Sequence, residues 1–298
     1  MGIVANQHFG KLADVWKHAV LAEVLEREPP GRYAETHAGS GAYALVHDGE
    51  RQFGVLRFLE AAGRYEALAH SRYRAIAASY ARDGHGVYPG SALLAMDVLG
   101  DRSSYLLCDL DPASVTDLRR RALELGLRRC MVAQADGMTA VAAWLDDAGP
   151  GKAALALVHI DPFDPYASAP GGRSALELAA CIADRGTRLV YWYGYDQPGE
   201  RWWAHEELAR LTTAPLWCGD VMVTDASGEG SLGDLGRATT PGTGSGIVLA
   251  NLQASTVRAC TALGNALADA YAGATLPDGS RGNLVFTSST SGGRGEQP

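Results

Sequence analysis

Short apolar segments alternate with helical segments along most of this chain, and nearly every apolar segment stops at an acid or a turn residue. The apolar segments are rich in Val, Ile, Leu and Tyr and lie at residues 104–111, 130–136, 154–161, 187–195 and 246–252. Between them, residues 112–127 and 171–186 have the spacing of amphipathic helices and glycine-type stops. This alternation predicts an α/β fold with a doubly wound, mostly parallel sheet.

Functional side chains of a doubly wound sheet gather beyond the carboxyl ends of its parallel strands. Four acids occupy such positions in this sequence, namely Glu35, Asp109, Asp136 and Asp161. We therefore expect these carboxylates to share one edge of the sheet.

Residues 45–87 break the alternation, because they have only helical patterning and fall between the first predicted strand and the next. The segment is rich in arginine and tyrosine: Arg51, Arg57, Arg64, Arg72, Arg74, Arg82, Tyr65, Tyr73 and Tyr80. A solvated helical pair with snorkelling arginines would have this composition. So would a lid that meets an anionic or aromatic substrate, and the position directly after the first strand favours the lid.

These boundaries predict four segments. Residues 1–44 form an N-terminal helix and the first strand, residues 45–87 form the inserted lobe, and residues 88–287 complete the sheet domain. Residues 288–298 are polar and rich in Gly and Ser, which predicts a flexible tail.

Composition narrows the class of protein. The 298 residues suffice for one large domain with an insertion, and 47% hydrophobic with 20% charged residues is typical of a globular protein. No segment has the length of a membrane span and the N-terminus lacks a signal layout, which predicts a cytoplasmic protein without membrane partners. The sequence is compatible with a monomer or a dimer.

The spacing of the cysteines and the negative net charge restrict the class of protein further. The five cysteines form no CxxC pair and the histidines no ligand-spaced pair, so we expect neither disulfides nor a metal site. The net charge of −8 lowers the expectation of nucleic acid binding without excluding it.

The stretch "RYAETHAGSGAY" joins a strand ending in Glu35 to a glycine-rich turn. Gly39 and Gly41 allow the backbone to approach a ligand. A dinucleotide site of the form G-x-G-x-x-A, ending at Ala44, needs an acid after the second strand, about twenty residues on. Glu60 has that spacing but lies in the helical lobe. The layout acid-x-x-x-Gly-x-Gly is instead typical of S-adenosylmethionine (SAM) enzymes.

The next two strand ends favour a nucleoside cofactor. Asp109, at the end of "YLLCDLDP", could accept both hydroxyls of a ribose, and Asp136, in "VAQADGM", could meet an adenine amino group. Either acid alone is more often a loop cap. In series after a glycine-rich turn, they indicate a cofactor such as SAM.

In order and combination, these motifs resemble those of the bacterial methyltransferases that N6-methylate an adenine of large-subunit (23S) ribosomal RNA. The resemblance covers most of the chain, through "HFGKLADVWKH", "ETHAGSGAY", "YPGS", "CDLDP", "ADG" and "IDP". It implies a class I, Rossmann-like SAM methyltransferase domain with a small helical lobe inserted after the first strand. It also implies SAM as methyl donor and S-adenosylhomocysteine as product.

The resemblance implies a set of site residues. It assigns SAM contacts to Lys17, His37, Ser91, Asp109 and Asp136, and it makes Asp161 the acid of the catalytic motif, next to the cofactor. The helical spacing after Lys11 independently predicts a buried apolar face with Lys17 and His18 at its border. There Lys17 could pair with the methionine carboxylate.

The catalytic motif of the family is Asp-Pro-Pro-Tyr, in which the acid accepts hydrogen bonds from the target amine and the aromatic ring stacks on the base. Here residues 161–166 read Asp-Pro-Phe-Asp-Pro-Tyr. Asp161 is kept, Asp164 occupies the aromatic position as a second catalytic candidate, and Phe163 or Tyr166 could stack on a base. The family also has an aromatic residue ahead of the first helix, where "MGIVANQ" offers only Ile3.

Five residues are candidates for substrate binding: His8, Phe163, Tyr166, Tyr195 and Trp202. A further stretch, "TPGTGSGI" at residues 240–247, could cradle a phosphate, although a flexible connection before the last strand is favoured.

The leading hypothesis is therefore a SAM-dependent N-methyltransferase whose acceptor is a small molecule, either a metabolite amine or a nucleoside. The direct alternative is an adenine-N6 methyltransferase of 23S ribosomal RNA that uses the arginine-rich lobe to hold RNA. An NAD-type oxidoreductase and a non-catalytic SAM-binding module are further alternatives.

Overall fold

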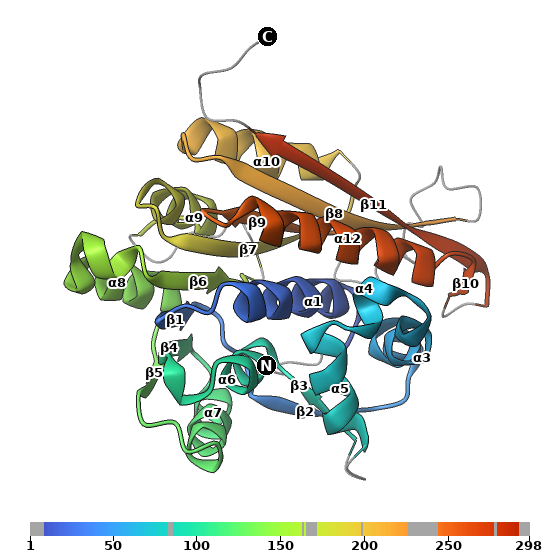
Figure 1. The fold of residues 1–298 in the computed structure, drawn as a ribbon, viewed down its shortest axis with the longest axis horizontal. Helices are drawn as coiled ribbons and strands as arrows, with labels where there is room; N and C mark the ends of the chain where they lie inside the picture. The colour runs from blue at the N-terminus through green and yellow to red at the C-terminus, as the bar shows by residue number, and fades with distance from the viewer. Residues whose placement is uncertain are drawn as a thin grey trace, which may run out of the picture.

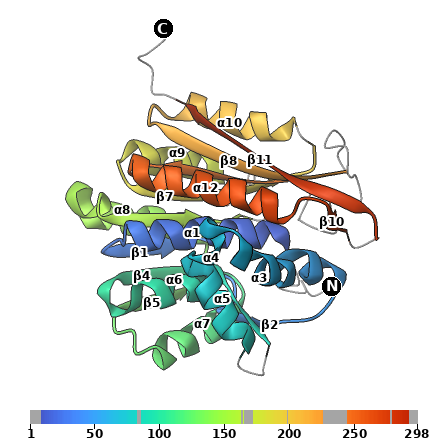
Figure 2. The ribbon, with the colours of Figure 1, turned by 45° about the vertical axis from the view of Figure 1, so that its right-hand side comes forward.

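The structure is a computed structural model that describes residues 9–82, 86–162, 164, 172–197, 199–225, 244–276 and 279–291. These residues form a nine-stranded sheet with helices on both faces, together with a lobe built on a two-stranded sheet (Figures 1 and 2). The strand order of the large sheet is β10-β11-β8-β9-β7-β6-β1-β4-β5.

One half of the large sheet is parallel, as the alternation predicts. It comprises β1 (Arg32–Glu35), β4 (Ser104–Asp109), β5 (Cys130–Gln134), β6 (Ala156–Ile160) and β7 (Arg188–Tyr195). The central strand β1 has β4 on one side and β6 on the other. The chain therefore winds outward in both directions from β1, and such a switch point is where doubly wound sheets bind ligands.

The other half of the sheet is antiparallel and was largely missed by the sequence pattern. Strand β9 (Gly244–Ala250) lies between β7 and β8 (Leu216–Asp225), and β11 (Arg281–Ser291) pairs with β8 and with the short β10 (Ala274–Thr275). The predicted tail begins too early, because Ser288–Ser291 continue β11 and pair with residues 216–219 of β8.

Helices cover both faces of the sheet. Helices α1 (Leu12–Arg27), α6 (Ser91–Leu99), α7 (Pro112–Glu124) and α12 (Ala254–Ala270) pack in one apolar cluster, while α8 (Gly137–Ala153), α9 (Ala175–Asp184) and α10 (Glu200–Leu211) pack in the other. Helix α1 lies between the sheet, α6 and α12 (Figure 1). It is consequently buried on nearly all sides, so the predicted border position of Lys17 and His18 is wrong.

Local sequence fixes where several helices begin. The side chain of Asp111 caps α7 by accepting the backbone N–H groups of Ala113 and Ser114, with Pro112 in the first turn. Ser174 and Glu177 form a capping box at the start of α9. These caps set the connections that leave the carboxyl edge of the sheet.

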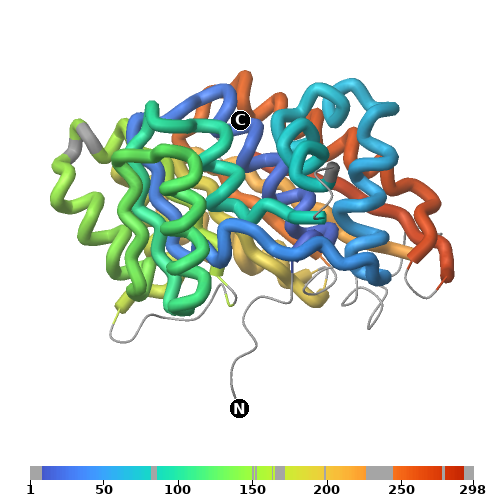
Figure 3. Tube along the Cα trace, turned by 90° about the horizontal axis from the view of Figure 1, so that it is seen from below, coloured from blue at the N-terminus to red at the C-terminus, as the bar shows by residue number. Residues whose placement is uncertain are grey.

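The lobe begins with strand β2 (Ala42–Ala44) and ends with strand β3 (Val87–Pro89), and these two strands pair antiparallel. It contains α2 (Gly49–Arg51), η1 (Gln52–Leu56), α3 (Arg57–Ala61), η2 (Ala62–Arg64), α4 (Glu66–Ala69) and α5 (Arg72–Arg82). The last strand before α6 is thus part of the lobe. Figure 3 shows the lobe beside the C-terminal part of the chain, where α4 packs on α12. A further 3-10 turn, η3 (Gly100–Arg102), follows α6.

Several arginines of the lobe are engaged inside the protein. Arg51 is buried and contacts Asp48 at 2.8 Å and Glu50 at 2.7 Å. Arg57 donates to the carbonyl of Ala270 at 3.0 Å, and Arg74 donates to the carbonyl of Ala69 at 3.2 Å. Part of the basic character of this segment therefore stabilises the lobe and its contact with α12.

Two glycines of "TPGTGSGI", Gly244 and Gly246, are residues of β9, whereas residues 240–243 lie outside the described part of the chain. In the ladder between β7 and β9, Tyr195 faces Gly244 and Tyr193 faces Gly246. A Cβ at Gly246 would lie 2.1 Å from Cζ of Tyr193. The glycines thus leave room for tyrosine rings that lie across the strand.

This packing predicts the effect of Gly246→Ala. The added methyl group must displace the ring of Tyr193, so we expect a loss of about 1–3 kcal/mol in the free energy of unfolding. Urea unfolding followed by circular dichroism measures it. Gly31→Ala is the control, since nothing lies within 4 Å of a Cβ there. Equal midpoints for the two variants would contradict the packing argument.

None of the helices in the described part of the chain combines the length and apolarity needed to cross a bilayer.

Candidate active site

The four strand-end acids meet at one edge of the sheet. Glu35 and Asp109 are the last residues of β1 and β4, Asp161 directly follows β6, and Asp136 follows β5 by two residues. Because these strands are parallel neighbours, their carboxyl ends share that edge. The acids nevertheless differ in burial and in hydrogen-bond partners, and these differences indicate a different role for each acid.

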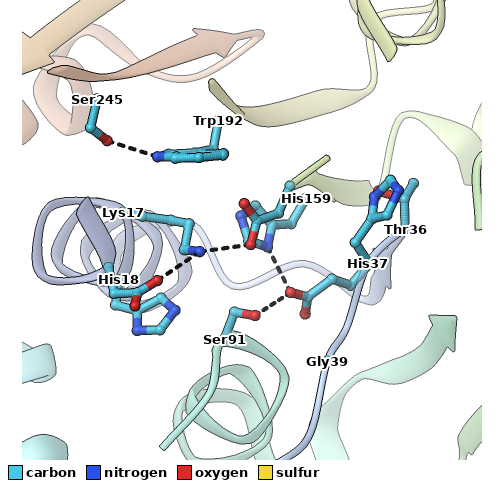
Figure 4. Close-up of polar contacts among 12 residues, drawn as sticks. Lys17, His18, Thr36, His37, Gly39, Ser91, His159, Trp192 and Ser245 are labelled. Carbon is cyan, nitrogen blue, oxygen red and sulfur yellow. Dashed lines mark hydrogen bonds and ion pairs between the residues drawn. The ribbon is translucent and has the colours of Figure 1, made fainter. Parts of the chain in front are cut away.

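Glu35 is an internal anchor. It is fully buried, and its carboxylate accepts hydrogen bonds from the hydroxyls of Tyr33 and Ser91. Nδ1 of His159 lies 2.9 Å from the same carboxylate (Figure 4). Glu35 therefore ties β1 to β6 and to the start of α6. Ser91, which the resemblance assigns to SAM, is buried, and its hydroxyl donates its hydrogen bond to Glu35.

Asp161 is paired with Lys17 of α1. The Nζ atom of Lys17 lies 2.7 Å from Oδ2 of Asp161 and 3.0 Å from Oδ1 of Asp14 (Figure 4). Burial alone lowers the pKa of Lys17, but the carboxylates of Asp161 and Asp14 outweigh burial and hold that pKa above its ordinary value. Lys17 is therefore a buried cation that touches the predicted catalytic acid.

The glycine-rich turn donates its amides to side chains of the protein. The N–H of Gly39 donates to Oδ2 of Asp109 at 2.8 Å, and the N–H of Ala42 donates to Asp117 at 3.1 Å. The N–H of Ser40 donates to the hydroxyl of Tyr43. A dinucleotide site needs such amides for phosphate groups, so this turn does not fit a pyrophosphate. That geometry disfavours the oxidoreductase alternative.

Asp109 and Asp136 fit a ligand that brings hydrogen-bond donors. Asp109 accepts the N–H groups of Gly39 and Asp111, and Asp136 accepts the N–H of Thr139 at 2.8 Å. Both side chains are only partly covered. A carboxylate has about four lone-pair sites, so each acid retains acceptor capacity for a ribose hydroxyl or an adenine amine. The residues present therefore fit the nucleoside part of SAM.

His37 lies among these acids. Its Nδ1 lies 2.8 Å from the hydroxyl oxygen of Thr36. Burial lowers the pKa of His37 below its ordinary value, although Asp161 and Asp109 oppose the shift. A neutral imidazole at this place can both donate and accept a hydrogen bond.

The predicted substrate residues are placed differently from one another. His8, Phe163, Tyr166 and Ile3 lie outside the described residues. Asp164 is exposed, and Trp202 on α10 is half-exposed with the guanidinium of Arg201 4.7 Å from its ring centre. Tyr195 is buried, with its ring against Gly244 of β9, so it packs within the sheet rather than lining an open pocket.

An aromatic residue does precede the first helix, namely Phe9, which lies just after the stretch "MGIVANQ". Phe9 stacks on Tyr43 with 4.8 Å between ring centres, and the guanidinium of Arg51 lies 4.5 Å from the Phe9 ring centre. Lys11 and Glu50 form an ion pair at 2.6 Å. The lobe thus holds the segment in front of α1 by stacking and charge.

Three further residues of the site were also missed: Asp14, His159 and Trp192. Asp14 stands three residues before Lys17, a spacing that places both on one side of a helix. His159 belongs to β6 and stands two residues before Asp161, which directly follows that strand. The period of two in an extended chain places both side chains toward the same face of the sheet. These spacings could have identified both residues.

The sheet order, the acids at its carboxyl edge and the glycine-rich turn define a Rossmann-like fold of the class I SAM methyltransferase type, which confirms the predicted fold class. Over residues 28–193 the chain matches the family described as "Ribosomal RNA large subunit methyltransferase D, RlmJ". The chain belongs to this family, and the resemblance seen in the sequence is thereby confirmed.

Two curated relatives agree with this assignment, and one solved structure shares the fold. "Ribosomal RNA large subunit methyltransferase J" of Escherichia coli is 31% identical over 169 residues, which cover 53% of this chain and 57% of the relative. The protein of the same name from Haemophilus influenzae is 31% identical over 168 residues, with the same coverage of both chains. The matched region thus spans little more than half the length of these relatives. A Legionella pneumophila protein of known crystal structure shares the fold, with a TM-score of 0.70 and 18% identity over 96% of this chain and 99% of its own.

Proposed function

We propose that this chain is a SAM-dependent N-methyltransferase that methylates the exocyclic amino group of an adenine in large-subunit ribosomal RNA. The observation that carries the proposal is Asp161, placed beside the acids of the nucleoside site and paired with Lys17 in a chain of this family. The names of the curated relatives support ribosomal RNA as the acceptor. This ordering reverses the sequence analysis, which placed a small-molecule acceptor first.

The chain's own residues would supply positioning and hydrogen-bond acceptors. When bound, SAM supplies an electrophilic methyl group on a sulfonium. The amino nitrogen of adenine is a poor nucleophile because its lone pair is delocalised into the ring. Asp161 would accept one N–H of that amine, which concentrates electron density on nitrogen and directs it toward the methyl group. Methylation of a neutral amine would place a positive charge on its nitrogen, and the amine would release one proton to solvent.

Cofactor binding would fall to the neighbouring strand ends. Asp109 and Asp136 have acceptor capacity for the ribose and the adenine amine of SAM, and His37 lies between them and Asp161. No metal is required for this chemistry, and the described residues contain no cluster of three or more ligand-type side chains that could hold a metal ion.

A small-molecule acceptor remains the second candidate, because two observations favour it. Asp164, exposed at the aromatic position of the family motif, suits a basic or hydrogen-bond-rich acceptor better than a flat base. Arg51, Arg57 and Arg74 of the lobe are engaged within the protein and contribute little to phosphate binding. The two candidates differ in acceptor and not in the chemistry at Asp161.

Transfer of labelled methyl groups separates the candidates. Purified protein with labelled SAM is given protein-free large-subunit ribosomal RNA in one reaction and a cell metabolite extract in another. We expect label in the RNA, and RNA binding that weakens steeply as salt increases. Label in the extract alone would assign the small-molecule acceptor. SAM binding without transfer to either acceptor would indicate a non-catalytic module.

A further inference from the structure

The ammonium group of Lys17 is paired with two carboxylates and lies over an aromatic ring. Two of its three N–H donors point to Asp14 and Asp161, and its Nζ lies 5.2 Å from the ring centre of Trp192. The indole of Trp192 is itself fixed, because its Nε1–H donates to the hydroxyl of Ser245 at 2.7 Å (Figure 4). The ammonium group is thus held between Asp14 of α1, Asp161 directly after β6 and the indole of Trp192 in β7.

We infer that Asp14, acting through Lys17, is a positioning residue for Asp161, and that Lys17 serves the catalytic acid. This inference rests on the proposed role of Asp161 as the acceptor of the amine N–H. It departs from the resemblance, which assigns Lys17 to the cofactor and assigns nothing to Asp14.

The contacts divide the two oxygens of Asp161 between two tasks. Oδ2 is bound to Lys17 at 2.7 Å. Among the described residues, Oδ1 has no hydrogen-bond partner, so it is the oxygen open to the acceptor amine. A carboxylate held at one oxygen cannot rotate freely about its Cβ–Cγ bond. The amine therefore meets an acceptor whose direction is already set.

Asp14 adjusts the strength of that acceptor. Asp14 and Lys17 are both buried and stand one helical turn apart, so their ion pair is weakly screened by water. Because Asp14 shares the charge of Lys17, Asp161 is not fully neutralised by its partner and remains a good hydrogen-bond acceptor. Removing Asp14 would leave the whole charge of Lys17 to Asp161.

The two partners can be removed separately with variants of similar size. Asp14→Asn keeps the shape of the side chain, and Lys17→Met keeps most of the buried chain while removing the charge. We expect kcat to fall on the order of tenfold or more in both variants, while the Kd for SAM changes less than about threefold. Glu23→Gln, which removes an ion pair with Arg27 on the same helix, is the control.

The split between turnover and binding separates positioning from stability. A variant that only destabilised the fold would keep kcat per folded molecule, whereas a misdirected Asp161 carboxylate lowers kcat at saturating SAM and acceptor. A large rise in the Kd for SAM with unchanged kcat in Lys17→Met would overturn the inference.

A second measurement keeps the inference separate from the proposed function. Aspartate carboxyl carbons labelled with carbon-13 are followed by NMR, and the signal of Asp161 is identified by its absence in Asp161→Asn. Its chemical shift should change both in Lys17→Met and in Asp14→Asn, whether or not RNA is methylated, because both variants alter the charge at or next to its partner. An unchanged chemical shift in both variants overturns the coupling even if RNA is a good substrate. Changed chemical shifts without methyl transfer would contradict only the proposed function.

Discussion

An Asp161→Asn enzyme is expected to lose kcat by a factor on the order of a hundred or more while binding SAM within about twofold of the unchanged chain. The amide replaces an acceptor oxygen with an N–H donor, which faces the N–H of the substrate amine or the ammonium of Lys17 instead of accepting from it. Either orientation removes the interaction that favours attack on the methyl group. Single-turnover methyl transfer and calorimetric SAM binding measure the two quantities.

Asp164→Asn is the matched control. Asp164 stands three residues after Asp161 in the sequence, and its side chain is exposed. If the acceptor is a flat base, the kcat of Asp164→Asn should stay within about threefold of that of the unchanged chain, because no step needs a second carboxylate. A loss comparable to that of Asp161→Asn would favour a basic small-molecule acceptor. Near-normal turnover in Asp161→Asn would reduce Asp161 to a turn residue.

Gly137→Ala is expected to have the second-largest effect, through the backbone. A Cβ at Gly137 would lie 1.9 Å from the carbonyl oxygen of Thr36 and 2.6 Å from its carbonyl carbon. Neither backbone can yield without moving a neighbour, since Asp136 precedes the glycine and His37 follows Thr36. We expect a loss of about 3 kcal/mol in the free energy of unfolding and SAM binding weaker by roughly tenfold or more.

Gly151→Ala is the comparison within the α8 segment. Gly151 lies near the other end of α8, beyond the break in helical geometry at Gly149, and nothing would be within 4 Å of its Cβ. Thermal unfolding with and without S-adenosylhomocysteine measures stability and ligand binding together. If Gly137→Ala matched Gly151→Ala in both, the contact between α8 and the turn after β1 would not shape the cofactor site.

The predictable part of this protein is the part encoded by short-range patterns. Each parallel strand is an apolar run that ends at a polar residue, so Glu35, Asp109 and Asp161 could be assigned to strand ends by inspection. A parallel sheet then places those ends together without further information. The helical character of residues 45–87 was visible for the same reason.

The parts that were missed depend on contacts between distant segments. Strands β8 and β11 pair with each other across more than fifty residues of sequence, and β11 carries many polar residues that read as a tail. Gly244 and Gly246 resemble a flexible loop until the tyrosines of β7 lie across them. Burial of Lys17 follows from α12 and the lobe covering α1, which no periodicity within α1 reveals.

The most direct measurement is the identity of the methylated nucleoside. Protein-free large-subunit ribosomal RNA is incubated with the chain and labelled SAM, digested to nucleosides and separated by chromatography with mass detection, beside the Asp161→Asn enzyme. Label in N6-methyladenosine that is absent from the Asp161→Asn reaction is the result we predict. Label in another nucleoside, or an RNA without label beside a labelled small molecule, would contradict the proposed acceptor.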